Sequence, residues 1–452
     1  MNTKRIRVLN DVPSPANGEY VLYWMQSAQR ITTNHALFHA IRIANRLKLP
    51  LRVLFVVAAY PDANARHYHF MLEGLKETVE ALETRGAEVI FQVGSFEKTV
   101  AAQLLRAAHA VFDDAAMPFM AEMKSRLATQ AATHGVPVEL VTTNLIVPLE
   151  ALPATCEYAA RTLRPKLWRK IDSFIDPVEL DALVKKRKPR GIFIDADAII
   201  KRLQIDTSIT KTSHFTGGEG AAQKRLKAFV DHGLKQYDAS SNPGSEATSQ
   251  LSPYLHFGHV SPLDAFLAVE VKQDLHRAEV EAFQEQLLVR RELAFNFAKR
   301  CEGFDRFETM TYGWAYDTLK AHEDDEREAV YTLEDYHNAN THDPYFNAAM
   351  NEMIHTGYMH NTMRMYWGKR IIAWSKTARD AYETIIALNN AYFLDGRDPV
   401  SYASVAWLFG RHDRGFPSQP VFGKVRSMTA GGLKRKYDMD AYLARIKKNT
   451  PS

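Results

Sequence analysis

The sequence is poor in cysteine, with only Cys156 and Cys301 among its 452 residues. The two lie far apart in the chain and form no CxxC or Cys/His cluster, which argues against a disulfide framework, a zinc site or an iron–sulfur cluster. The sequence also lacks an apolar signal core at its start and the roughly 18 uncharged apolar residues that a membrane span needs. We therefore expect a soluble protein of the reducing cytoplasm.

A strong charge of one sign is also absent. The formal net charge is +4 and the pI is near 8.7, which excludes a histone-like polycation but leaves room for a local basic surface that binds nucleic acid. The basic run 184–191 is best interpreted as a solvated linker. No GxGxxG follows the first predicted strand, so the dinucleotide fingerprint is missing.

What the sequence does have is apolar residues, 46% of the chain, enough for two or three domains. Near-continuous apolar strands separated by amphipathic helices predict a five-stranded, parallel, Rossmann-like sheet in an α/β domain over 18–148. A connector over 149–212 and an all-α domain over 213–450 follow. The expected strands are 20–24, 51–57, 87–93, 110–114 and 136–141, with helices near 33–48, 64–85, 96–108 and 118–134.

The segment 359–374, MHNTMRMYWGKRIIAW, predicts one further helix. Its apolar residues recur at i, i+4, i+8 and i+11, which is typical of a helix packed in a core. Trp367 and Trp374 share a face roughly 10 Å apart along the axis, because seven residues make two helical turns. Spacing alone favours core packing and leaves open whether the indoles have a second role.

A series of motifs in fixed order connects these segments. They are YWMQSAQRITTNHAL (23–37), EYAARTLRPKL (157–167), TGGEGAA (216–222), SQLSPYLHFGHVSP (249–262), VRRELAFNF (289–297), YTLEDY (331–336), THDPYFNAAMNEMIHTGYMHNTMRMYW (341–367), LNNAYFLDGRDP (388–399) and HDRGF through FGKVRSM (412–428). Over about residues 20–440 the series resembles the class II cyclobutane pyrimidine dimer photolyases of the photolyase/cryptochrome superfamily.

The resemblance implies an N-terminal antenna domain, a connector, and a helical domain that binds FAD in a folded, U-shaped form. It also implies light-driven DNA repair, in which an excited FADH⁻ passes one electron to a flipped-out pyrimidine dimer. The cyclobutane ring then opens and the electron returns, so the reaction is that of a carbon–carbon lyase.

The resemblance further implies a flavin site. Arg364 and Asp395 match a charged pair that lies against the isoalloxazine ring and stabilises its anionic reduced form. Asn389 matches the position that faces flavin N5, where an amide tunes the redox state without adding charge. Helix C-capping by Asn389 is the alternative, as a plain serine N-cap is for the phosphate turn. The expected phosphate contacts are Tyr237, Thr248, Ser249, Gln250, Leu251 and Ser252.

The lesion site implied by the resemblance centres on Glu292. This residue matches an acid that hydrogen-bonds the dimer carbonyl and whose proton can stabilise the thymine radical anion. An ion pair with a neighbouring arginine is the alternative. An aromatic ring stacked on a flipped base contributes about 1–3 kcal/mol. The other residues expected to face the lesion are Asn361, Met365 and Trp407.

The segment 411–428 matches the loop that contacts DNA and fills the gap left by the flipped dimer. Arg414 and Arg426 match arginines that enter this gap or contact phosphates, and Lys424 adds a backbone contact. Phe416 stands where the family usually has tryptophan, so it serves as a smaller apolar wedge or simply fills the core. We expect a monomer that binds double-stranded DNA carrying a dimer, more weakly than the family norm.

Trp367 and Trp374 also match the family's photoreduction route, with Trp367 next to the flavin. The family's further tryptophan lies in a DP-x-W-N-A motif, where this chain has Phe346. Phenylalanine is much harder to oxidise than an indole, so slow photoreduction with intact repair is predicted. Tyr345 or the Trp374 branch could substitute.

Two rival functions stay open at this point. A cryptochrome-like photoreceptor would keep the flavin without repair. The short stretch after DMDAYLARI leads us to expect no signalling tail, and Glu292 and Trp407 are retained, so this rival is less favoured. A nucleic-acid-binding protein that has lost its flavin would be colourless.

The family can also hold an antenna chromophore, 8-hydroxy-5-deazaflavin or folate, in its N-terminal domain. The segment QSAQR (26–30) departs from the family's usual QRDQR, so the sequence does not decide which one binds.

Overall fold

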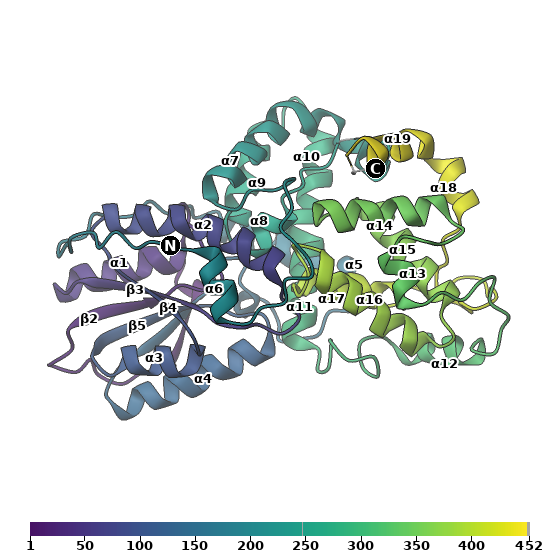
Figure 1. The fold of residues 1–452 in the computed structure, drawn as a ribbon. Helices are drawn as coiled ribbons and strands as arrows, with labels where there is room; N and C mark the ends of the chain where they lie inside the picture. Colours follow the sequence, from purple (N-terminus) through teal and green to yellow (C-terminus); the bar gives the residue numbers. More distant parts are fainter. Residues whose placement is uncertain (246, 450–452) are drawn as a thin grey trace.

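The computed structural model describes residues 1–245 and 247–449, in which an α/β half packs beside an all-helical half (Figure 1). The α/β half holds a six-stranded sheet in the order β1-β6-β5-β2-β3-β4, antiparallel only between β1 and β6. The strands are β1 (Ile6–Asn10), β2 (Tyr20–Trp24), β3 (Leu51–Val57), β4 (Glu88–Val93), β5 (Ala107–Asp113) and β6 (Val138–Val141). The five predicted strands are confirmed as the parallel part, and β1 is an edge strand that the prediction missed.

Helices cover both faces of the sheet, as predicted, because the strands alternate their side chains between two cores. Val21 and Tyr23 of β2 face the core under α1 and α2, whereas Leu22 and Trp24 face the core under α3 and α4. The four helices are α1 (His35–Leu47), α2 (Ala65–Thr84), α3 (Phe96–Leu104) and α4 (Pro118–Thr133).

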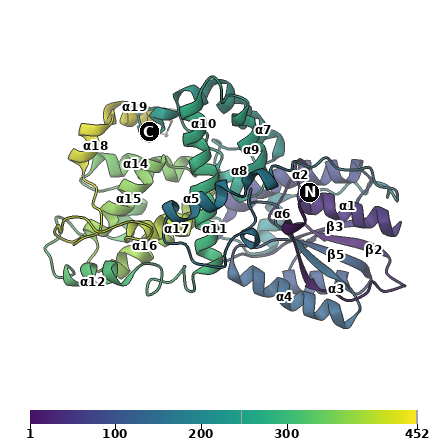
Figure 2. The same cartoon turned by 180° about the vertical axis from the view of Figure 1, so that it is seen from behind.

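The connector contains η2 (Leu149–Ala151), α5 (Ala160–Trp168), η3 (Ile171–Phe174) and α6 (Ala196–Arg202). It passes from one side of the molecule to the other: its first α-helix, α5, lies toward the viewer in Figure 2, and its last, α6, lies toward the viewer in Figure 1. Its basic run 184–191 is largely exposed, in agreement with the linker interpretation. The connector also carries Cys156, which forms a disulfide with Cys301 across a Cα–Cα distance of 5.3 Å. The prediction against a disulfide is wrong for this pair, because the connector folds back onto the end of α11.

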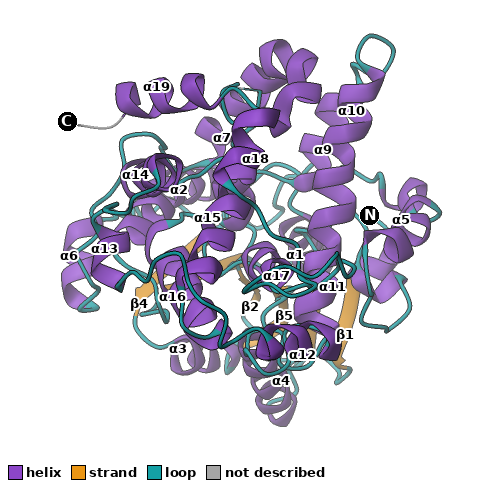
Figure 3. Ribbon diagram, turned by 90° about the vertical axis from the view of Figure 1, so that its right-hand side faces the viewer, coloured by secondary structure: helices purple, strands orange, loops and turns teal. Residues whose placement is uncertain are grey.

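The remaining chain is helical (Figure 3), and no helix among the described residues is long and apolar enough to span a bilayer. The elements are α7 (Glu219–Ala228), η4 (Phe229–Gly233), η5 (Leu234–Ser241), α8 (Ser252–His256), α9 (Pro262–Glu270), α10 (Arg277–Gln284), η6 (Glu285–Arg290), α11 (Arg291–Arg300), α12 (Gly313–Ala321), α13 (Leu333–His337), α14 (Pro344–Thr356), α15 (Asn361–Trp374), α16 (Ala378–Tyr392), α17 (Pro399–Leu408), α18 (Ala430–Lys436) and α19 (Met439–Asn449).

The helix predicted over 359–374 is confirmed as α15, which runs through the largest helical core. The preceding helix α14 ends at Gly357, whose φ of 72° gives the left-handed C-cap that a glycine adopts without strain. Within α15, Gly368 lets α17 approach closely, since a Cβ there would lie 2.2 Å from a methyl carbon of Leu408. Gly357 thus ends α14 before α15 begins, and Gly368 leaves room for the Leu408 side chain of α17.

Candidate active site

A cavity of about 510 Å³ opens among the helices of the C-terminal half. This volume is within the range of about 300–1,000 Å³ that small-molecule sites occupy. It collects side chains that are far apart in the sequence, from η5, the η6 turn and helices α15 to α17. The sequence-predicted residues that line it are Tyr237, Ser249, Leu251, Ser252, Asn361, Arg364, Met365, Trp367, Asn389, Asp395 and Trp407.

Arg364 and Asp395 form a fixed ion pair in the cavity wall. The guanidinium Nη2 donates to both carboxylate oxygens at 2.9 and 3.1 Å, while its Nε donates to the carbonyl of Met359 at 3.2 Å. The guanidinium also lies 3.8 Å from the centroid of the Phe393 ring. Four contacts hold the cation in one orientation, so it can stabilise an anionic ligand without rearranging.

The Asn389 amide is oriented by its neighbours. Its oxygen accepts from the hydroxyl of Ser401 at 2.8 Å, and its nitrogen donates to the side chain of Asn390 at 2.9 Å. Ser401 uses one of the two lone pairs of the oxygen and Asn390 accepts one of the two N–H groups, so Asn389 can still offer one donor and one acceptor to the cavity. The capping alternative does not describe this side chain, which is buried and bonded to the side chains of Ser401 and Asn390 rather than to a backbone group at the end of α16.

Two of the predicted phosphate contacts do not line the cavity. Thr248 accepts a hydrogen bond from the Tyr358 hydroxyl at 3.2 Å. Gln250 has a φ of 51°, and its side-chain oxygen accepts from Arg225 at 2.7 Å. The positive φ turns Gln250 away from the cavity that Ser249 and Ser252 line. The predictions for Thr248 and Gln250 as direct ligand contacts are therefore corrected.

The donor set that does line the cavity fits FAD. Hydroxyl groups of Tyr237, Ser249 and Ser252 suit a pyrophosphate and a ribityl chain. The Arg364–Asp395 pair suits a ring that becomes anionic on reduction. The buried Asn389 amide uses one of its two N–H groups on Asn390, which leaves the other for a bound ligand.

Glu292 is placed differently from the prediction. Its carboxyl group does not line the cavity but lies at the junction with the α/β half, where Oε1 accepts from the backbone N–H groups of Ile146 and Val147 at 2.7 and 3.0 Å. Its Oε2 is buried without a partner among the described residues. Burial raises the pKa of Glu292 to about 8, against the smaller effect of the two backbone hydrogen bonds. The structure therefore places Glu292 outside the predicted lesion site, as a protonated carboxyl that joins the two halves.

This geometry gives a pH dependence. The unfolded carboxyl ionises near pH 4.5 and the folded one near pH 8, so its contribution to stability is full below pH 4.5 and lost as the pH rises through 8. We predict that the free energy of unfolding falls by about 4 kcal/mol between pH 5 and pH 9 from this group. Urea unfolding of the wild type and of Glu292→Gln measures it. In Glu292→Gln the free energy of unfolding should no longer fall between pH 5 and pH 9, and DNA repair should be kept. If the variant is as stable as the wild type at pH 5 but does not repair DNA, Glu292 belongs to the lesion site as first predicted.

The sequence reasoning missed several residues that line the cavity. Gln286 and Arg290 lie on η6, a π-helical turn. A π turn holds one residue more than an α turn and is frequent at functional sites, so it shifts the lining positions relative to Glu292. The other missed residues are His256, Asp398 and Ser401. The His256 ring lies 3.0 Å from the Asp398 carboxylate, and although burial would raise the pKa of Asp398, this contact lowers it.

The predicted DNA loop lies against Trp407 at this cavity. Arg426 lies 5.8 Å from the Trp407 ring and 4.3 Å from the Phe416 ring, and its Nε pairs with Asp413 at 2.9 Å. Arg414 approaches the same phenyl ring at 5.5 Å. Phe416 is thus a partly exposed ring between two arginines, not a core residue, and the exposed loop side chains include Lys424.

The two predicted photoreduction tryptophans are on one helix but in different surroundings. Trp367 lines the cavity, and its indole N–H donates to the sulfur of Met350 at 3.0 Å. Trp374 is completely buried behind it. Phe346 contacts Trp374, with ring centroids 5.0 Å apart. Phe346, which stands where the resemblance leads us to expect tryptophan, therefore packs directly against Trp374.

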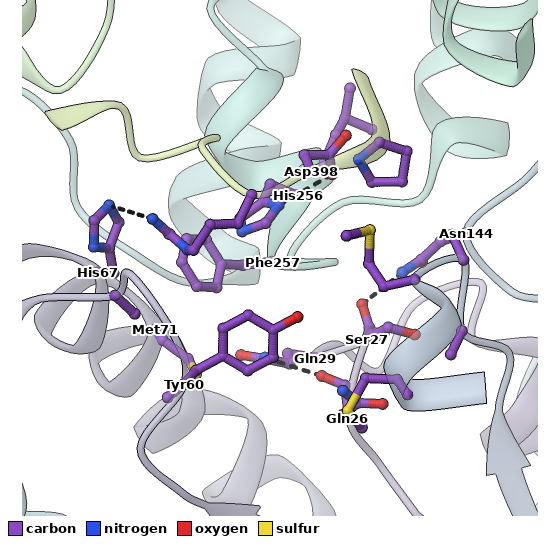
Figure 4. Close-up of a pocket in the computed structure, with 18 of the residues that line it drawn as sticks. Gln26, Ser27, Gln29, Tyr60, His67, Met71, Asn144, His256, Phe257 and Asp398 are labelled. Carbon is purple, nitrogen blue, oxygen red and sulfur yellow. Dashed lines mark hydrogen bonds and ion pairs between the residues drawn. The ribbon is translucent and has the colours of Figure 1, made fainter. Parts of the chain in front are cut away.

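A second cavity, of about 230 Å³, lies between the α/β half and the helical half (Figure 4). Gln26, Ser27 and Tyr60 line it from one side and Phe257 from the other. It shares four lining residues with the first cavity, namely Leu255, His256, Arg291 and Asp398. These four side chains therefore form one layer that lines both cavities.

Comparisons with known proteins agree with this layout. The family model described as DNA photolyase matches residues 21–190, and the one described as FAD binding domain of DNA photolyase matches 283–408. A deoxyribodipyrimidine photo-lyase from Methanothermobacter thermautotrophicus is 38% identical over 99% of both chains. The enzymes of that name from Oryza sativa and Potorous tridactylus are 36% and 32% identical over 98% of this chain and 90% and 85% of theirs.

Solved structures share the fold at low sequence identity. A class III photolyase from Agrobacterium tumefaciens aligns with a TM-score of 0.73 at 18% identity, covering 97% of this chain and 88% of that one. An archaeal photolyase from Sulfolobus tokodaii with two FAD molecules aligns with a TM-score of 0.70 at 15% identity, covering 95% and 89%.

Proposed function

The chain belongs to the DNA photolyase family, and from this premise we propose how its own residues carry out the light-driven repair of cyclobutane pyrimidine dimers in DNA. The enzyme is a deoxyribodipyrimidine photo-lyase that uses FAD and binds damaged DNA. A cryptochrome-like receptor without repair is less supported, since near-full-length relatives above 30% identity carry the photo-lyase name. The residue roles below are our proposal.

The proposal rests on one observation: the predicted flavin contacts and the predicted lesion contacts line the same cavity. Tyr237, Ser249 and Ser252 would hold the diphosphate part of FAD. Arg364 and Asn389 would contact its ring. FAD, bound in its reduced form, supplies the light-excited one-electron donor that splits the dimer.

The chain's own residues then bind and orient the flipped dimer. Trp407 and Met365 give it an apolar wall that excludes water, and stacking on an indole contributes about 1–3 kcal/mol. With Glu292 outside the cavity, the amide N–H groups of Gln286 and Asn361 are the donors we propose for the dimer carbonyls. Neither amide can give up a proton, so these residues stabilise developing negative charge by hydrogen bonding alone.

The loop 411–428 would enter the duplex when the dimer leaves it. Arg414, Lys424 and Arg426 offer cations to phosphates, and Phe416 offers an apolar wedge. We propose double-stranded DNA as the partner and a monomer as the binding unit. We also propose the boundaries 18–148, 149–212 and 213–450 for the three parts of the chain, and a working location where the genome is, the cytoplasm in a prokaryote.

The function is tested by the visible spectrum of the purified protein and by repair of a thymine-dimer oligonucleotide in light and in darkness. A flavin spectrum with light-dependent repair supports the proposal. A flavin spectrum without repair would favour the receptor, and a colourless protein that binds DNA would favour the flavin-free alternative.

We further propose that the second cavity holds the antenna chromophore. The four residues that it shares with the flavin cavity would keep the two pigments close, which energy transfer requires. Replacing Ala116, which lines this cavity, by tryptophan should remove the antenna's absorption band and keep the flavin band. Ala132→Trp on α4, away from both cavities, is the matched control. Retention of the antenna band in Ala116→Trp would place the chromophore elsewhere.

A further inference from the structure

A tyrosine and a histidine connect the buried Trp374 to the surface. The ring centroid of Tyr331 lies 5.0 Å from that of Trp374, with the planes at 71°, and the His342 ring lies 5.3 Å from it. Trp374 is fully buried, whereas Tyr331 is partly exposed and the His342 side chain is 46% exposed. The two residues are therefore the outer neighbours of Trp374, as Phe346 is one of its buried neighbours.

The hydrogen bonds define where the phenolic proton points. The backbone N–H of His342 donates to the Tyr331 oxygen at 2.9 Å, so the hydroxyl is free to donate its own proton elsewhere. That oxygen lies 2.5 Å from His342 Nδ1. A neutral imidazole that accepts at Nδ1 carries its hydrogen on Nε2, which faces Glu328 Oε1 at 3.6 Å. In this tautomer the phenol donates to a base whose other nitrogen faces a carboxylate.

The surrounding charges favour oxidation of Tyr331 over oxidation of Trp374. The Arg370 guanidinium lies 4.4 Å from the centroid of the Trp374 ring and pairs with Glu328 at 2.7 Å. A cation over the ring attracts a neutral indole but repels the radical cation that remains after electron loss. Tyr331 can lose an electron and its proton together and stay neutral, and the positive charge then lies on His342 beside Glu328.

A neighbouring tyrosine lacks this arrangement. Tyr336 lies 5.4 Å from Phe346 and 6.1 Å from Tyr331, measured between ring centroids, but it is buried. Its hydroxyl has no hydrogen-bond partner in the described part of the chain. Oxidation of Tyr336 would leave its proton without an acceptor, so it serves as an internal control.

We propose that Tyr331 is the terminal electron donor of the photoreduction route and that His342 is its proton acceptor. One electron passes from Tyr331 to the oxidised indole of Trp374; the phenolic O–H bond breaks and an N–H bond forms at His342 Nδ1. The products are neutral Trp374, a neutral tyrosyl radical and an imidazolium. The photo-oxidant at the inner end is the light-excited oxidised flavin. A thiolate from solution then gives an electron to the tyrosyl radical, and the proton returns from His342.

This inference rests on the photoreduction role of Trp367 and Trp374 proposed from the family resemblance. Laser flash spectroscopy of the flavin-loaded protein tests it. In the wild type, an indole radical should give way to a neutral tyrosyl radical, more slowly in D₂O than in H₂O because a proton moves. Tyr331→Phe should leave a long-lived indole radical and no tyrosyl signal. His342→Gln, which keeps a polar group but no base, should slow tyrosyl formation by about 100-fold.

The outcomes distinguish a failure of this inference from a failure of the photoreduction route on which it rests. Tyr336→Phe should behave as the wild type. An indole radical that decays at the same rate in the wild type and in Tyr331→Phe would overturn the inference alone. A wild type without any indole radical would overturn the photoreduction route and the inference with it. A readout without flavin is the tautomer of His342 by nitrogen NMR, expected as Nε2–H; an Nδ1–H tautomer would contradict the proposal.

Discussion

Replacing Trp407 by alanine should lower the affinity for a thymine-dimer duplex by about 10- to 100-fold, because the indole that stacks on the flipped base contributes about 1–3 kcal/mol. Undamaged DNA should bind almost unchanged, since the arginines of the loop 411–428 supply the phosphate contacts. The flavin content should also stay the same. Titration of damaged and undamaged duplexes with the reduced protein in the dark measures the difference.

Trp168→Ala is the matched control for this experiment. Trp168 is 39% exposed on α5 of the connector and does not line the flavin cavity. Its loss should leave both affinities unchanged. Equal weakening for damaged and undamaged DNA in Trp407→Ala would show that Trp407 supports the loop rather than the lesion, and an unchanged affinity for damage would remove Trp407 from the lesion site.

Phe346→Trp should speed the reduction of the flavin by light. The new indole would lie against Trp374 and is far easier to oxidise than a phenyl ring. The gain should be on the order of tenfold or more, since lowering the barrier by about 1.4 kcal/mol already gives a factor of ten. The rate of flavin bleaching under continuous light with a thiol measures it, and repair by chemically reduced enzyme should not change.

Phe346→Leu separates the effect of an oxidisable ring from that of repacking. Position 346 is fully buried, so both substitutions disturb the same core. The leucine variant should photoreduce no faster than the wild type. If Phe346→Trp folds, binds flavin and photoreduces at the wild-type rate, the phenylalanine does not limit the route.

Much of the fold follows from local patterns. The five parallel strands are largely apolar runs, and all of them except the edge strand β4 are mostly buried. The helices between them are amphipathic, so both were predicted within a few residues. The strand β1 was missed because only one edge of it is paired and its side chains are at most half-buried. The Cys156–Cys301 disulfide was missed because it joins residues 145 positions apart, and no local pattern encodes such a contact.

The site was predictable wherever a residue type and a motif point to one chemistry. The Arg364–Asp395 pair and Asn389 lie in the cavity as expected. Glu292 was misplaced because a π-helical turn precedes it, and the extra residue shifts the cavity-lining positions to Gln286 and Arg290. Gln250 was misplaced for a similar reason, because its positive φ reverses the direction of the side chain. Irregular backbone geometry, which residue patterns do not report, accounts for both errors.

The central claim is that one cavity holds both the reduced flavin and the flipped dimer. The most direct measurement is the recovery of intact thymines in a dimer-containing oligonucleotide that is mixed with fully reduced, flavin-loaded enzyme and given light or kept dark. The account predicts repair in the light, none in the dark, and a marked loss of light-driven repair in Trp407→Ala at limiting DNA. Dimers that persist under light although the reduced flavin is bound would contradict it.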